Sequence, residues 1–169
     1  SLFLSRGEAA TYPLLRGRII QVVSPLYHTM AADGGDNVFV YMGGDQEVPD
    51  GVTHAVIHPS VTIVPRLAFS YRRQLVSVIF HDDVEIIEAA AFNWCVSLRG
   101  IKLLGVREIR RRAFQHCYAL SDVEFGDELE TIGADAFCHC RSLRSIKMPP
   151  VRTVHGFAFC ECDQLYDVE

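Results

Sequence analysis

The stretch LSDVEFGDELETIGADAFCHC, residues 120–140, carries most of one copy of a pattern that recurs through the second two-thirds of the chain. Its reference point is the dipeptide Ala-Phe, which occurs five times. The phenylalanines of these dipeptides are Phe69, Phe92, Phe114, Phe137 and Phe159, and the steps between them are 23, 22, 23 and 22 residues. Self-similarity at a fixed period of this length predicts a solenoid, in which each repeat forms one coil and stacks on the next.

Other positions hold one kind of residue at a constant distance from these phenylalanines. A leucine stands six residues after each Phe, and a cysteine stands three residues after it in every copy except the first, which has Arg72. The leucines are Leu75, Leu98, Leu120, Leu143 and Leu165, and the cysteines are Cys95, Cys117, Cys140 and Cys162. One repeat cannot bury these side chains alone, so the columns predict a continuous core shared by neighbouring coils.

Apolar residues nine and eleven positions after each Phe alternate with polar ones. The pairs are Val78/Phe80, Ile101/Leu103, Val123/Phe125 and Ile146/Met148. Alternation of this kind predicts a half-buried strand. Each repeat is therefore expected to form a strand, a turn of two or three residues and a short helical or 3₁₀ segment that carries Ala-Phe. The predicted fold class is an α/β repeat solenoid with one parallel β-sheet and the short helical or 3₁₀ segments opposite it.

The run Leu-x-x-Ile at the strand, followed by Ala-Phe-x-x-Cys, resembles the BspA-type leucine-rich repeat. The resemblance covers about five copies over residues 52–169, with a sixth copy truncated. It implies a curved, right-handed leucine-rich-repeat horseshoe used for protein or surface recognition, and it brings no catalytic residues. The first copy departs from the pattern at Pro65 and Arg72, as expected for a terminal repeat. Because Glu169 falls inside a strand of the sixth copy, we expect the native protein to continue beyond it.

Residues 1–51 carry no repeat and are expected to form an N-terminal cap or linker region. Two short strands are predicted there, at 18–23 and 37–41, with a flexible turn over 31–36. A cap would cover the apolar surface and the open sheet edge of the first coil. The chain opens with Ser1 in place of Met, so its native start is expected to lie upstream.

Composition and motifs narrow the classes of function. Sixteen Lys and Arg against 21 Asp and Glu give a net charge of −5, which argues against nucleic acid held by an overall basic surface. No apolar run is long enough for a membrane span. Neither a nucleophile elbow nor a phosphate-cradling loop nor a dinucleotide fingerprint occurs. We therefore assign no catalytic residue, no cofactor and no small-molecule substrate, and we do not expect an enzyme.

The solvent-facing side of the predicted sheet offers the candidate binding face. The strand position ten residues after each Phe holds Ile79, Lys102, Glu124, Lys147 and Glu169. The favoured interpretation of alternating Lys and Glu is a self-neutralising ladder that sets the register of the coils. The alternative is a polar partner-binding face, for which the candidate residues are Ser77, Ile79, Lys102, Asp122, Glu124, Ser145 and Lys147. Its small flanking residues suit a protein partner.

Cysteine pairs recur at equivalent places on two neighbouring copies, as Cys138-x-Cys140 and Cys160-x-Cys162. With His139 and His155 they could supply zinc ligands. Because Cys140 and Cys162 belong to the buried column, free thiols are favoured over a disulfide or a zinc ion, and no metal site is assigned.

Arginines gather near the centre of the chain. Arg110-Arg111-Arg112, with Arg107 and Arg141, could form a basic spot for an acidic partner or a phosphate. A solvated surface is the commoner explanation of such a run.

Taken together, these features predict a non-catalytic protein–protein interaction or scaffold module that binds another protein through its strand-lined face. The alternative is a structural or substrate-recruiting repeat segment of a larger protein, linked to an enzyme or adhesive at a cell surface. A cytoplasmic location is slightly favoured over a secreted or cell-surface one, because no signal peptide is present in the chain and the thiols are expected to be reduced.

Overall fold

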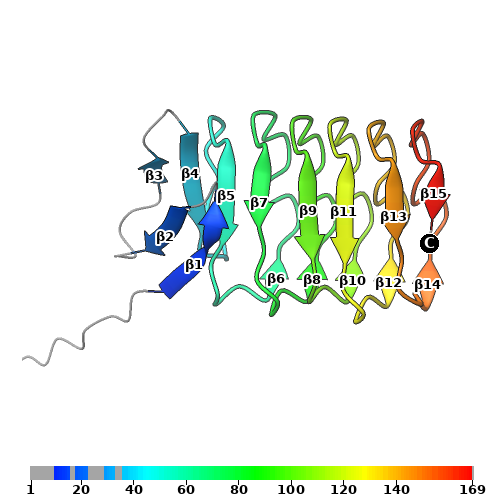
Figure 1. The fold of residues 1–169 in the computed structure, drawn as a ribbon, viewed down its shortest axis with the longest axis horizontal. Helices are drawn as coiled ribbons and strands as arrows, with labels where there is room; N and C mark the ends of the chain where they lie inside the picture. The colour runs from blue at the N-terminus through cyan, green and yellow to red at the C-terminus, as the bar shows by residue number, and fades with distance from the viewer. Residues whose placement is uncertain (1–9, 16–17, 23–28, 33–35, 169) are drawn as a thin grey trace, which may run out of the picture.

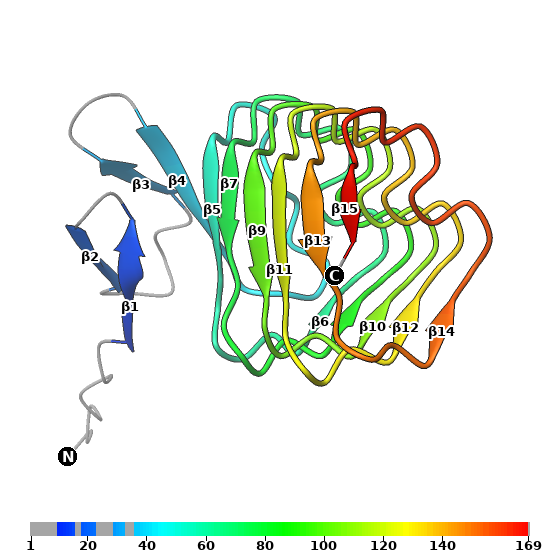
Figure 2. The same cartoon turned by 45° about the vertical axis from the view of Figure 1, so that its right-hand side comes forward.

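The computed structural model describes residues 10–15, 18–22, 29–32 and 36–168. Two parallel sheets run along the length of this part of the chain, and each coil contributes one strand to each sheet (Figures 1 and 2). A segment of turns closes the third side of every coil. The expectation of a parallel-strand solenoid is confirmed, whereas the expectation of a single parallel sheet is wrong.

The large sheet has eight strands in the order β15-β13-β11-β9-β7-β5-β4-β3. Neighbouring strands are parallel throughout, except that β3 is antiparallel to β4. The strands are β3 (Thr29–Ala32), β4 (Asp36–Tyr41), β5 (His54–Ile57), β7 (Ser77–Ile79), β9 (Gly100–Leu103), β11 (Asp122–Phe125), β13 (Ser145–Lys147) and β15 (Asp167–Val168). From β7 to β13 the buried and less buried side chains alternate, as the sequence pattern predicts.

The small sheet has five parallel strands of two residues each, in the order β14-β12-β10-β8-β6. These strands are β6 (Ile63–Val64), β8 (Ile86–Ile87), β10 (Glu108–Ile109), β12 (Thr131–Ile132) and β14 (Thr153–Val154). Each ends on the aliphatic residue that stands five positions before the Phe. Two residues are too few to show the alternation that identifies a strand in a sequence, so this sheet was not predicted.

The segments that carry Ala-Phe contain no helix in the described chain, so the predicted helical and 3₁₀ segments are wrong. The residues two before and two after each Phe adopt a left-handed backbone conformation, with φ between 54° and 64°. They are Leu67, Tyr71, Ala90, Trp94, Arg112, His116, Asp135, His139, Phe157 and Glu161. Left-handed residues at this spacing interrupt a right-handed helix and leave a chain of turns. Accordingly, no described helix is long and apolar enough to cross a membrane.

The turn segments are joined to one another by backbone hydrogen bonds. The amide of the Phe in each of the first four Ala-Phe dipeptides donates to the carbonyl oxygen of the Ala in the next Ala-Phe dipeptide, at 2.7–2.8 Å. The pairs are Phe69 to Ala91, Phe92 to Ala113, Phe114 to Ala136 and Phe137 to Ala158. A helix would use these amide groups within one coil, whereas the turns direct them to the neighbouring coil. The third side of the solenoid is therefore also held by a ladder between coils.

The repeated side chains form columns inside the solenoid. The rings of successive phenylalanines are stacked, with centroids 4.8–5.3 Å apart from Phe69 to Phe159, and Tyr41 packs edge-on against Phe69. Each cysteine of the column donates its thiol hydrogen to the carbonyl of the Phe in the preceding coil, with sulfur–oxygen distances of 3.1–3.3 Å. This position needs a side chain that is small enough for the core and can donate a hydrogen bond to the preceding coil, and cysteine has both properties.

Arg72 replaces the cysteine where the first repeat meets the N-terminal region. Its Nε donates to the carbonyl of Val48 at 2.5 Å, and its guanidinium lies 3.1 Å from the Asp50 carboxylate. The longer side chain thus makes the same kind of hydrogen bond to the preceding segment. This explains why the first copy departs from the repeat pattern.

The N-terminal region contains β1 (Ala10–Leu15) and β2 (Arg18–Val22), which form an antiparallel hairpin. The strands expected at 18–23 and 37–41 correspond to β2 and β4, and the sequence did not predict β1 and β3. Because β4 pairs in parallel with β5, the large sheet extends into the first 51 residues. The hairpin lies in front of β4 and β5 (Figures 1 and 2), where the outward side chains His54 and Val56 are buried.

Close packing of neighbouring turns leads to a test of the coil stacking. A Cβ placed on Gly126 would overlap the carbonyl oxygen of Leu104 in the preceding coil, whereas a Cβ on Gly156 meets open space. We expect Gly126→Ala to lower the free energy of unfolding by about 2 kcal/mol or more. The matched change Gly156→Ala should alter it by less than about 0.5 kcal/mol. Urea denaturation followed by circular dichroism measures both, and equal effects would contradict the stacking described.

Candidate partner-binding face

All seven predicted face residues lie on the same side of the large sheet, between β7 and β13. Ser77 and Ile79 are half-buried, and the other five are exposed. The register places Glu124 opposite both Lys102 and Lys147, and it places Asp122 opposite Ser145. The spacing of the repeats predicted that these residues are neighbours on adjacent coils, and the structure places them opposite one another on adjacent strands.

A shallow groove of about 1150 Å³ runs across this face. Every predicted residue except Ser77 lines it. Ser77 lies toward the covered end of the sheet, where its Oγ is 2.6 Å from Nδ1 of His54. The sequence did not identify the residues that the turns add to the rim of the groove, which include Phe80, His81, Asp82, Leu104 and Asp127. They follow directly after the strands, so their place in the repeat is the signal that could have revealed them.

The charged ladder on this face is only partly neutralised. The ammonium nitrogen of Lys102 lies 2.6 Å from Oε2 of Glu124, and both side chains are more than half exposed. An exposed pair of this kind stabilises a protein by roughly 0–1 kcal/mol. Lys147 has no carboxylate oxygen within 4.0 Å among the described residues, although it lies opposite Glu124 in register. A position opposite an acidic residue in the strand register therefore does not guarantee that a basic side chain is neutralised.

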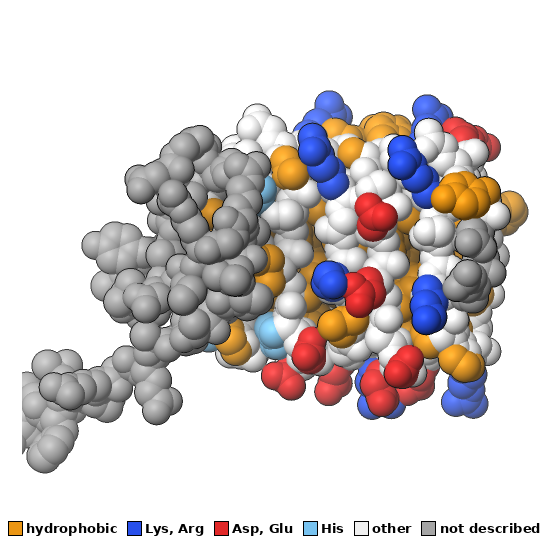
Figure 3. Space-filling view, viewed as in Figure 1, with side chains coloured by type: hydrophobic (Ala, Val, Ile, Leu, Met, Phe, Trp, Pro, Cys, Tyr) orange, Lys and Arg blue, Asp and Glu red, His pale blue; other side chains and the backbone are white. Residues whose placement is uncertain are grey.

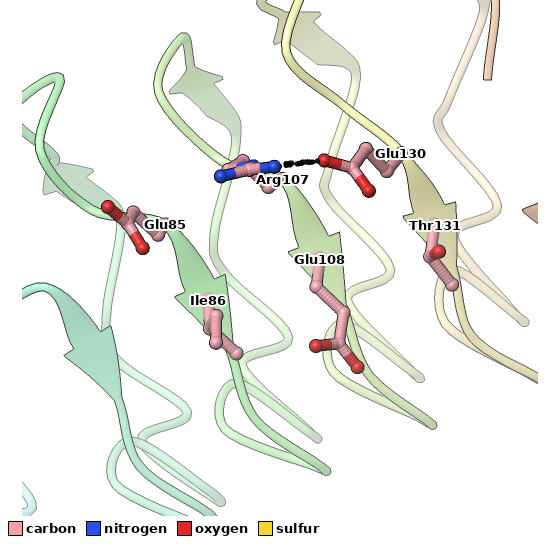
Figure 4. A pocket seen from close by; sticks show the side chains of 6 residues that line it. All are labelled: Glu85, Ile86, Arg107, Glu108, Glu130 and Thr131. Atoms are coloured by element: carbon pink, nitrogen blue, oxygen red, sulfur yellow. Dashed lines mark hydrogen bonds and ion pairs between the residues drawn. The ribbon is translucent and has the colours of Figure 1, made fainter. Parts of the chain in front are cut away.

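The small sheet carries a second alternating row of charges, Glu85, Arg107 and Glu130, on three successive coils (Figure 4). Nε of Arg107 donates to Oε1 of Glu130 at 3.0 Å. That hydrogen bond raises the pKa of Arg107 and lowers the pKa of Glu130 from their ordinary values. These residues line a hollow of about 230 Å³. Within it Arg107 already faces Glu130, and Glu108 faces Arg110.

The five arginines of the predicted basic spot are each paired with a carboxylate. Arg107 pairs with Glu130, and Arg110 lies 2.9 Å from Glu88 and 3.0 Å from Glu108. Arg111 and Arg112 both face Asp135, at 3.7 and 3.4 Å, and Arg141 lies 3.9 Å from Asp163. The fold supplies its own counter-charges here, so these arginines do not form a free anion site.

Two of the six cysteines are joined. Cys138 and Cys160 form a disulfide between neighbouring coils, which corrects the expectation that all the thiols are free. The pair stands one residue after Phe, where stacking of adjacent coils brings equivalent side chains together. The carboxylate of Asp135 lies within 4.8 Å of both sulfurs. Those sulfurs are bonded to each other, however, and a thiolate is the form that binds zinc.

The cysteines of the column remain free thiols. Burial raises the pKa of Cys95 to about 12 and that of Cys162 to about 11. It also raises the pKa of Cys117 and Cys140 well above the ordinary value. Since the thiolate is the reactive form, these groups are unsuited to nucleophilic catalysis.

Half-buried rings form a further column two residues after Phe92, Phe114 and Phe137. Trp94, His116 and His139 are stacked in succession, with centroids 4.1 and 4.5 Å apart. Burial lowers the pKa of His116, and the nearby positive charges of His139, Arg141 and Arg112 lower it further. The folded protein therefore favours a neutral His116.

The lowered pKa of His116 predicts the direction in which the free energy of unfolding changes with pH. Below about pH 6.5, the ordinary pKa of histidine, the unfolded chain binds a proton that the folded chain binds less well. The free energy of unfolding should therefore fall as the pH drops from 7.5 to 5.5. His116→Gln should reduce this dependence, and His155→Gln makes the same change at an exposed position as the control. Denaturant titrations at both pH values measure the slope, and an equal slope in parent and His116→Gln would contradict the assignment.

Thiol counting tests the disulfide. Under denaturing, non-reducing conditions the chain should show four reactive thiols, rising to six after reduction. Cys160→Ser should expose the thiol of Cys138 and give five without reduction. A count of six before reduction in the parent would contradict the bridge.

With the fold and the face described, comparisons with known proteins define the class. The molecule is a leucine-rich-repeat solenoid, and the chain belongs to the family whose sequence profile is described as the BspA type leucine-rich repeat region. That profile matches residues 52–169 with six copies. Comparison with curated protein sequences found no match.

Two solved structures resemble the chain. A leucine-rich repeat protein of T. pallidum has 29% identity and a TM-score of 0.68, over 86% of this chain and 70% of that one. A leucine-rich cell surface protein of Faecalibacterium prausnitzii A2-165 has 20% identity and a TM-score of 0.58, and that match supports the fold alone. It covers 94% of this chain and 54% of that protein, so the chain spans about half of that relative. Such repeats typically serve as interaction or scaffold modules without catalytic activity.

Proposed function

We propose that this chain is a non-catalytic interaction module that binds another protein through the large-sheet face between β7 and β13. The observation that carries the proposal is the open groove, to which the outward side chains of four neighbouring strands contribute. The groove crosses coils instead of lying within one, so it suits an extended partner surface better than an enclosed small molecule.

The chemistry of the groove supports a protein partner. Ile79 and Phe80 are half-buried at the β7 end of the groove, and Leu104, which follows β9, is exposed. Charged side chains lie on β9, β11 and β13. Apolar contacts bordered by polar groups are the composition of a protein–protein interface. The covered strand β5 limits the face at its N-terminal end, because its outward side chains are buried.

The cytoplasmic location favoured by the sequence stays a prediction. A disulfide persists mainly in oxidising compartments, so the bridge between Cys138 and Cys160 supports export instead. The thiol count of protein isolated from its native cells distinguishes the two locations.

Steric blocking of the groove tests the proposed function. The double variant Gly100→Trp/Ser145→Trp places two bulky uncharged side chains in the groove, and a Cβ on Gly100 meets only ordinary contacts. The matched control Thr131→Trp/Thr153→Trp adds the same bulk to the small sheet. We expect a partner captured from native extract to bind the groove variant at least about tenfold more weakly than the control. Equal binding by both variants of equal folded content would contradict the proposal.

A further inference from the structure

The charges of the solenoid repeat with a period of two coils, which is twice the period of its core. The 22-residue coils carry basic side chains, and the 23-residue coils carry acidic ones in their longer turns. Arg99, Lys102 and Arg107 of one short coil recur 45 residues later as Arg144, Lys147 and Arg152. Asp82, Asp83 and Glu85 of one long coil recur 45 residues later as Asp127, Glu128 and Glu130. Basic and acidic coils therefore alternate along the stack.

We propose that the large-sheet face binds an extended acidic segment of the partner protein, whose carboxylates contact Arg99 and Lys102 on one coil and Arg144 and Lys147 two coils further on. This inference rests on the proposed function and adds the chemistry of the ligand. It treats the two basic coils as two equivalent binding positions separated by one acidic coil.

Three of the four cations have no carboxylate partner and carry the proposal, whereas Lys102 is paired with Glu124. Arg99, Arg144 and Lys147 are exposed, and within the described ranges no carboxylate oxygen lies within 4.0 Å of their charged groups. Arg144 has only a 3.5 Å hydrogen bond to the side-chain oxygen of Gln164. Arg107 and Arg110, by contrast, are paired with glutamates around the small sheet. The cations of the large-sheet face are therefore open to the carboxylates of a ligand. Arg66 and Arg152 also have no carboxylate within 4.0 Å among the described residues, but they lie elsewhere on the surface.

Basic and acidic side chains lie mostly at opposite edges of the large-sheet face, the basic ones where the strands begin and the acidic ones where the strands end. Arg99 and Arg144 directly precede β9 and β13, whereas Asp82 and Asp127 follow β7 and β11. Figure 3 shows Lys and Arg side chains along the edge where the strands begin and mostly Asp and Glu along the opposite edge. Asp122 begins β11 between the two basic coils at the first edge. A ligand is therefore attracted to this edge when its carboxylates lie over β9 and β13 and not over β11, and it is repelled by the second edge. A long polyanion such as nucleic acid fits less well, because the acidic edge and the net charge of −5 repel it.

The spacing of the two basic coils suits a particular backbone conformation. Equivalent positions on β9 and β13 are two strand spacings apart, or about 9.6 Å. In a polyproline II segment, which rises about 3.1 Å per residue with three residues per turn, every third residue lies on one side about 9.3 Å from the last. Side chains on one face of a β-strand recur at about 6.7 Å and its multiples, which do not match. The preferred ligand thus has an acidic residue at every third position of an extended, proline-rich segment.

Synthetic peptides test this directly. Fluorescence anisotropy of labelled (Glu-Pro-Pro)₄ should show saturable binding to the folded chain that weakens as salt increases. (Lys-Pro-Pro)₄ should not bind, and a peptide with the same four glutamates placed together should bind less tightly. Arg99→Gln/Arg144→Gln should weaken binding of (Glu-Pro-Pro)₄ at least about tenfold. The matched control Arg66→Gln/Arg152→Gln removes the same charge elsewhere and should change the affinity by less than about twofold.

The outcomes separate this inference from the proposed function. If a captured protein partner is displaced by Gly100→Trp/Ser145→Trp but unaffected by Arg99→Gln/Arg144→Gln, the face binds proteins and the acidic ligand is wrong. Absence of peptide binding, equal loss in both glutamine variants, or tighter binding of heparin or an oligonucleotide than of the peptide would also overturn it. Circular dichroism and thermal unfolding of each variant establish that only folded protein is compared.

Discussion

The structure depends on the contact of each coil with the next. The phenylalanine rings stack at 4.8–5.3 Å, and the backbone of every coil donates hydrogen bonds to its neighbours on all three sides, two as sheets and one through the turn segments. The Ala-Phe dipeptide serves both kinds of contact, since Ala supplies the acceptor carbonyl and Phe supplies the donor amide and the stacked ring. A single repeat has no neighbour to stack on and cannot bury these side chains alone, so it has no core of its own.

This stacking determines what the surface can do. Equivalent positions on successive coils become neighbours in space, so a charge pattern along the sequence becomes a charge pattern across a face. On the small sheet the alternation of acidic and basic coils brings Arg107 to Glu130 and neutralises both. On the large sheet the same alternation leaves Arg99, Arg144 and Lys147 unpaired among the described residues. The first arrangement supports the register of the coils, and the second offers a face to a partner.

Much of the architecture could be predicted from the sequence, because columns such as Phe92, Cys95 and Leu98 require burial and recur in register. The seven face residues followed from the same spacing, although their binding role stays a proposal. The helix prediction failed because the residues in the left-handed conformation, such as Ala90 and Trp94, are not glycines. Nothing in the sequence therefore marked these positions as breaks in a helix. Strands of two residues show no alternation, and the bridge between Cys138 and Cys160 depends on how closely two coils approach. The two-coil period of the charges is present in the sequence. Its role in binding could be proposed only after the structure showed which of these charges form ion pairs.

Hydrogen–deuterium exchange of the native chain tests the central claim most directly. The amides of Phe69, Phe92, Phe114 and Phe137 lie in segments without helix or strand, yet each donates to the adjacent coil. We predict that they exchange as slowly as the amides of β9 and β11, since opening them requires separating two coils. Exchange at the rate of exposed loop amides would contradict the claim that the turn segments hold the coils together.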